Sequence, residues 1–160
     1  MRRLLSGRVA RGARWAEGLL VACSVAAVLS LSGCEIETSD NGRLDGFWLL
    51  TTVDTIGGGS ADVAARAMTW AFQGRIMELR QADGKSGLDI ICQFDHQGDT
   101  LLVSHPFIID RNNEDIRVDD AALLAPFGLT ALSESFFVSH LGSESMVLRS
   151  TVLQLRFRRY

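Results

Sequence analysis

The sequence predicts an all-β fold, an antiparallel up-and-down barrel of about eight strands. Apolar and polar residues alternate with period two in one segment after another, as in strands with one buried face. Turn-forming pairs such as Gln73-Gly74, Asp83-Gly84 and Gln97-Gly98 separate these segments at hairpin spacing. The stretches between them are too short for the helical crossovers that parallel strands need. A barrel is favoured because closing such a meander removes exposed sheet edges.

Eight or nine strands follow one another along the chain. They are expected at 47–53, 68–72, 75–81, 90–94, 101–109, 116–118, 136–140, 146–148 and 153–157. Two stretches break the pattern. Residues 56–66 contain a glycine triplet, and we expect a mobile loop there with a helical turn capped by Ser60 or Asp62. Residues 119–132 are expected to hold a short helix that ends at Pro126.

The N-terminal segment has the pattern of a secretory signal peptide. Five arginines precede Gly18 to Leu31, which is nearly all apolar or small. A membrane-spanning helix is the alternative, but a span needs about 20 apolar residues and this run is shorter. We therefore expect residues 1–33 to be removed and to take no part in the fold.

Leu31-Ser32-Gly33-Cys34 stands where the apolar run ends and a polar one begins. These four residues resemble the lipobox of bacterial lipoproteins. The resemblance implies that the chain is cut before Cys34, which is acylated and becomes the first mature residue. The alternative is ordinary cleavage that leaves a free thiol. The expected organisation is a signal peptide at 1–33, a lipidated tether at 34–43 and a barrel domain at 44–160.

Charge and cysteine content exclude several classes of function. The chain has 16 basic and 19 acidic residues; removing the five arginines and Glu17 of residues 1–33 leaves 11 and 18, a formal charge of −7. Nucleic-acid binding relies on clustered basic residues, so it is not expected, and neither is electrostatic docking on an anionic membrane. No Cys-x-x-Cys motif suggests structural zinc, and Cys92 is expected to be a small buried hydrophobe.

Gly46-Phe47-Trp48 opens the first expected strand and resembles the lipocalin signature. The resemblance implies a close backbone approach at Gly46 and a plug at the closed end of the barrel by Trp48. It also implies a basic residue of the last strand over that tryptophan, for which Arg156, Arg158 and Arg159 are the candidates. "MTWAFQGRIMEL", "APFGLTAL" and "LQLRFRRY" are further similar to small lipocalin-like lipoproteins of anaerobic gut bacteria. That family implies a fold and a location, and little about substrate.

Apolar residues of the inward faces are candidates for a ligand pocket. They are Met68, Trp70, Phe72, Ile90, Cys92, Phe94, Phe136 and Val138. A packed core is the alternative, because eight strands either fill with side chains or hold one small ligand. Loops at 57–59 and 123–129 are candidates for the mouth. Leu124, Phe127 and Leu129 are expected to cap it rather than lie exposed.

Neither a metal-binding site nor a catalytic site is expected in this chain. The acidic segment 110–120 lacks the glycine and glutamate of an EF-hand, so a solvated hairpin is favoured. His96, His105 and His140 have no second ligand at metal spacing. Ser104 and His105 are adjacent on a strand and are expected to point to opposite faces, which excludes a nucleophile–base pair. We therefore expect no metal, no cofactor and no enzymatic activity.

The sequence as a whole suggests a lipid-anchored protein of the cell envelope, on the outer membrane, with its periplasmic or surface face undecided. The leading expectation is non-catalytic binding of a small apolar ligand inside the barrel. The alternative is a protein-interaction or envelope-structural module whose barrel is filled, and which uses its acidic rim or the loop around Phe127.

Overall fold

One antiparallel sheet holds all the strands of the described chain. The computed structural model describes residues 41–82 and 88–160. The strands are β1 (Gly46–Thr55), β2 (Ser60–Asp62), β3 (Met68–Gln73), β4 (Ile76–Gln81), β5 (Ile90–Gln97), β6 (Thr100–Ile108), β7 (Ile116–Arg117), β8 (Glu134–Leu141), β9 (Ser145–Arg149) and β10 (Leu153–Arg159). Four 3-10 turns join them: η1 (Gly42–Leu44), η2 (Ala64–Arg66), η3 (Ala121–Leu123) and η4 (Ala125–Phe127).

The sheet closes on itself because β10 pairs with β1 as well as with β9. Strands β1, β3, β4, β5, β6, β8, β9 and β10 form the closed barrel, while β2 and β7 are short additions to β1 and β6. All the pairs of adjacent strands in the barrel are antiparallel. The predicted fold class, an antiparallel barrel of about eight strands, is confirmed.

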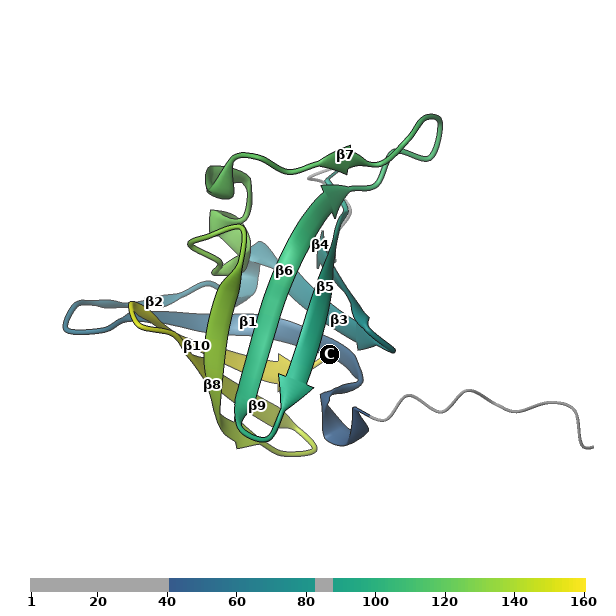
Figure 1. Cartoon of the computed structure of the whole chain (residues 1–160). Helices are drawn as coiled ribbons and strands as arrows, with labels where there is room; N and C mark the ends of the chain where they lie inside the picture. The colour runs from purple at the N-terminus through teal and green to yellow at the C-terminus, as the bar shows by residue number, and fades with distance from the viewer. Residues whose placement is uncertain (1–40, 83–87) are drawn as a thin grey trace, which may run out of the picture. The chain divides into compact units, whose positions relative to one another are not determined.

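The two ends of the barrel differ in what covers them (Figure 1). At one end, which we call the base, lie η1, the start of β1 and the β3–β4, β5–β6 and β8–β9 turns. At the other end, the mouth, β7 and the η3 and η4 turns cross over the strand ends. The alternation of strand side chains places one residue in two toward the interior. The fold therefore presents an inner face, an outer face and two different ends.

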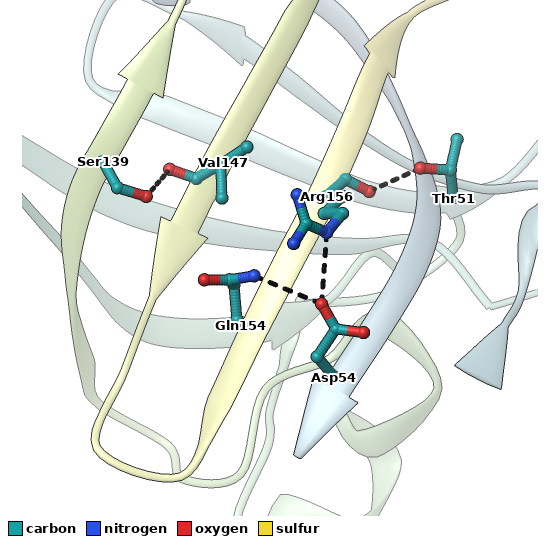
Figure 2. A network of polar contacts seen from close by, with 6 residues as sticks. All are labelled: Thr51, Asp54, Ser139, Val147, Gln154 and Arg156. Carbon is teal, nitrogen blue, oxygen red and sulfur yellow. Dashed lines mark hydrogen bonds and ion pairs between the residues drawn. The ribbon is translucent and has the colours of Figure 1, made fainter. Parts of the chain in front are cut away.

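Backbone pairing of β1 with β10 closes the barrel, and side-chain polar contacts lie on the outer side of this seam (Figure 2). The carboxylate of Asp54 accepts hydrogen bonds from Arg156 Nε at 3.1 Å and Gln154 Nε2 at 3.2 Å. Thr51 lies at a β-bulge of β1, and its hydroxyl donates to the carbonyl of Arg156 at 2.9 Å. Hydrogen bonding from Ser60, then from Arg156 and Gln154, lowers the pKa of Asp54 below its ordinary value.

The two stretches without strand pattern differ in detail from what the sequence predicts. Residues 60–62 pair with β1 as strand β2, where only a loop is expected, because β3 covers just the first four residues of β1 and leaves the rest of that edge free. The helical turn follows at η2, and Asp62 accepts a hydrogen bond from the Ala64 amide. Pro126 is the second residue of η4 instead of the end of a helix, since its missing N–H costs nothing in a first turn.

Candidate functional site

The base of the barrel is closed by Trp48, which is completely buried. Its indole Nε1 donates to the carbonyl of Leu44 in η1 at 2.8 Å. The guanidinium carbon of Arg159 lies 4.5 Å from the Trp48 ring centroid, and its Nη1 donates to the carbonyl of Arg43 at 3.3 Å. Gly46 has φ +107°, and a Cβ there would lie 3.4 Å from this guanidinium. Gly46, Trp48 and Arg159 thus pack against one another and close the base of the barrel.

Of the three candidate arginines, Arg159 is the one that lies over Trp48, and Arg156 and Arg158 do not contribute to the base. Strand alternation explains the difference: Leu155, Phe157 and Arg159 share the inward face of β10, while Arg156 and Arg158 point outward. Arg156 is instead bonded to Asp54 on the outer side of the seam, and Arg158 is exposed. The signal was present in the sequence, since Arg159 continues the period of Leu155 and Phe157.

We expect Arg159→Ala to lower the free energy of unfolding by about 0.5–2 kcal/mol, because it removes the cation–π contact with Trp48 and the bond to η1. Arg158→Ala, on the same strand and exposed, is the matched control and is expected to change it by less than about 0.5 kcal/mol. Urea unfolding followed by tryptophan fluorescence measures both. Equal effects of the two variants would contradict the assignment.

The eight candidate pocket residues lie on the inner face of the barrel and belong to its core. Six of them, Trp70, Phe72, Ile90, Cys92, Phe94 and Phe136, keep at most 6% of their surface accessible. Met68 and Val138 are partly buried and pack against the same cluster. A side chain that lined a water-sized void would retain accessible surface, so these six residues are packed against one another rather than around open space.

Trp70 is the centre of this packing. Its ring centroid lies 5.0 Å from that of Phe157, 5.8 Å from that of Phe136 and 6.2 Å from that of Phe72. Phe94 meets Phe72 edge to face at 5.1 Å. The Trp70 indole donates to the Phe127 carbonyl at 3.0 Å, which ties the core to the mouth. Aromatic rings therefore fill the middle of the barrel.

The segment that contains η3 and η4 caps the mouth, as the sequence predicts. Leu124, Phe127 and Leu129 each keep at most 2% of their surface accessible. Gly128 ends η4 with φ +86°, and a Cβ there would lie 2.8 Å from Leu155 Cδ2. The Gly128 backbone thus packs closely against the Leu155 side chain of β10, which a Cβ at this position would displace. The loop around Phe127 is consequently no exposed apolar patch.

An apolar outer surface near the base was not anticipated from the sequence. A groove of about 580 Å³ runs along the first halves of β1 and β4 and the end of β3. Its lining residues are Asp45, Gly46, Phe47, Ala71, Phe72, Gln73, Ile76 and Glu78. A second groove of about 280 Å³ continues from Ile76 over Ile91 to Phe107. The sequence feature that could have revealed this surface is the placement of Phe47 and Ile76 at outward positions of their strands, where each side chain is half exposed.

Ser104 and His105 lie closer together than strand alternation predicts. His105 has φ +53° at an irregular pairing of β5 and β6, and its Nδ1 lies 2.9 Å from Ser104 Oγ. A bulge re-aims the side chain in this way. The expectation of opposite faces is therefore wrong. A nucleophile needs a base that is itself oriented by a third group, and the other ring nitrogen has no hydrogen bond to the described residues.

The remaining candidates for chemistry are surface or core features. Residues 111–117 of the acidic segment are exposed, and Asp110 folds back on Asn112 and Asn113. In residues 41–82 and 88–160, no three His, Cys, Asp or Glu side chains are placed to share a metal ion. Cys92 is buried, as predicted, and its burial raises the pKa of the thiol to about 12. Its thiol is therefore inert at neutral pH.

Cys34, the signal peptide and the tether up to residue 40 lie outside the described residues. The described chain contains no helix with the length and hydrophobicity of a membrane span. At its start, Asn41 Nδ2 donates to the Gly74 carbonyl at 2.7 Å and to Asp45 at 2.9 Å. The chain therefore enters the barrel beside the β3–β4 turn, at the base.

A closed eight-strand barrel with a tryptophan and arginine at its base fits one family in particular. The family model of the lipocalin-like domain matches residues 29–160. The chain belongs to this lipocalin-like family. A lipocalin-like protein from Bacteroides uniformis has a similar structure, with TM-score 0.57 and 20% identity over 74% of this chain and 100% of that one. An uncharacterized protein from Bacteroides eggerthii is similar at TM-score 0.56 and 19% identity, over 73% and 99%. No curated protein matches the chain.

Proposed function

We propose that this lipocalin-like protein is a lipid-anchored, non-catalytic module of the cell envelope, attached to the outer membrane, and that it acts through its outer surface. The observation that carries this proposal is the filled interior: Trp70 is completely buried and touches Phe72, Phe136 and Phe157. A barrel packed in this way is a rigid scaffold. Such a scaffold displays its faces and loops, and the six candidate pocket residues named above leave no water-sized space among themselves.

The anchor is supported by the sequence around Cys34. Leu31-Ser32-Gly33-Cys34 follows an apolar run preceded by five arginines, and a short polar segment leads from it to the barrel. Several acyl chains on one residue hold a protein stably at a membrane, whereas one chain does not. The formal charge of −7 leaves the anchor, rather than basic residues, to provide the attachment.

Binding of a small apolar ligand inside the barrel is the second candidate function. The described inner face is lined by apolar side chains, and the segment that contains η3 and η4 covers the mouth. A ligand would have to displace this cap. Displacement breaks the hydrogen bond between Trp70 and the Phe127 carbonyl and exposes three buried side chains of residues 124–129.

Native mass spectrometry of the protein purified from its own cells in mild detergent separates the two functions. We expect the mass of the acylated chain and no bound small molecule. Phe127→Ala, which loosens the cap, should lower stability and still show no ligand. An apolar molecule bound to the unaltered protein, together with a larger bound fraction in the Phe127→Ala variant, would favour the interior site and contradict the proposal.

A further inference from the structure

Exposed apolar, aromatic and basic side chains lie at the base beside the groove along β1, β3 and β4. Phe47 and Ile76 are 50% and 53% exposed and line the same groove. Tyr160 is 66% exposed, and its amide donates to the Phe47 carbonyl at 3.0 Å, so it lies beside them. Arg43 in η1 and Arg75 in the β3–β4 turn are exposed at the same end. We call these five residues the base face.

The chain meets the base face where the described residues begin. Asn41 bonds to the Gly74 carbonyl, one residue from Arg75 and two from Ile76. Seven peptide steps separate Asn41 from Cys34, and a fully extended chain of that length spans at most about 25 Å. An acyl group on Cys34 would therefore keep the base, where Asn41 lies, within about 25 Å of the bilayer.

We propose that the base face lies against the lipid surface, so that the bilayer itself is the partner that covers Phe47 and Ile76. This inference rests on the proposed acylation of Cys34. Apolar side chains enter the region between headgroups and acyl chains, tyrosine favours the interface, and arginines reach lipid phosphates. The barrel then has one orientation, with the mouth and the acidic segment 110–120 directed away from the membrane.

The charges around the groove are compatible with this orientation. Asp45 accepts a hydrogen bond from Asn41, and Glu78 lies 3.7 Å from Arg80, so both carboxylates have partners within the protein. The tether residues Glu35 to Asp40 are mostly polar and acidic, which makes them unsuited to covering an apolar groove. A protein partner or a second copy would have to reach this surface past the short tether.

Site-directed fluorescence on the anchored protein tests the orientation. The full-length chain is expressed with acylation and reconstituted into phosphatidylcholine vesicles that carry a headgroup-nitroxide lipid. Ile76→Cys and Phe47→Cys receive an environment-sensitive label. Ile116→Cys and Leu123→Cys are the controls, because the native side chains are 54% and 39% exposed and belong to β7 and η3 at the mouth. Native Cys92 does not react, since it is buried and its thiol pKa is about 12.

We expect labels at 47 and 76 to shift to the blue and to be quenched by the nitroxide lipid at least roughly twofold more than labels at 116 and 123. Equal quenching at all four positions, in protein whose Cys34 is shown by mass to be acylated, would overturn the orientation and leave the anchor intact. Shielding at 76 that depends on protein density, without quenching, would assign the face to a second copy and also overturn it. Absence of acyl mass on Cys34 would overturn the anchor itself.

Discussion

Trp70→Ala is expected to lower the free energy of unfolding by about 3–5 kcal/mol, a large part of the stability of a domain of this size. The ring is fully buried and contacts Phe72, Phe136 and Phe157. Its removal leaves a cavity among these rings and takes the only indole donor from the Phe127 carbonyl. The core and the cap should therefore loosen together. Urea unfolding followed by circular dichroism measures the change.

Two further variants separate the parts of this effect. Trp70→Phe keeps most of the ring contacts and loses the hydrogen bond, so a smaller loss of about 1–3 kcal/mol is expected. Phe137→Ala removes an aromatic ring that is 54% exposed on the outer face, and should change stability by about 0.5 kcal/mol or less. If Trp70→Ala were as mild as Phe137→Ala, the interior would not be packed as described, and an internal ligand site would regain support.

Cys34→Ala is expected to abolish incorporation of radiolabelled palmitate and to release the protein from the membrane fraction. Each buried methylene contributes about 0.8 kcal/mol to membrane binding, so the loss of every acyl chain on one residue removes the attachment completely. The barrel itself should fold unchanged, because residue 34 precedes the domain expected at 44–160. Labelling of intact cells, followed by fractionation and blotting, measures both results.

Cys92→Ala is the matched control for the anchor. It replaces the free cysteine of the barrel core, and both palmitate labelling and membrane association should persist. Undiminished labelling of Cys34→Ala would refute acylation at this residue. Labelling lost without release from membranes would mean that another part of the protein holds it there, either uncleaved residues 1–33, which the mass of the chain would reveal, or the base face.

Much of the fold could be predicted because strand alternation is a local signal. The segments around Trp70, Cys92 and Phe157 have period two in the sequence and form β3, β5 and β10 in the structure. The same period, followed one step further, identifies Arg159 as the residue over Trp48. The failures lie where alternation stops: β2 pairs with a free edge of β1, and a bulge turns His105 toward Ser104. Edges and bulges depend on the partner strand, which the local sequence does not contain.

The sequence by itself determined that this chain is a barrel of antiparallel strands with a glycine–tryptophan start, because hydrophobic period and turn residues act over a few positions. It also supplies the whole case for the lipid anchor, since Cys34 lies outside the described structure. Only the tertiary structure decided that Trp70 and its neighbours fill the interior, and that Phe47 and Ile76 share an outer groove beside the end of the tether. An inward apolar side chain looks the same in sequence whether it faces a cavity or another ring. That distinction depends on the diameter of the closed barrel and on which side chains meet across it.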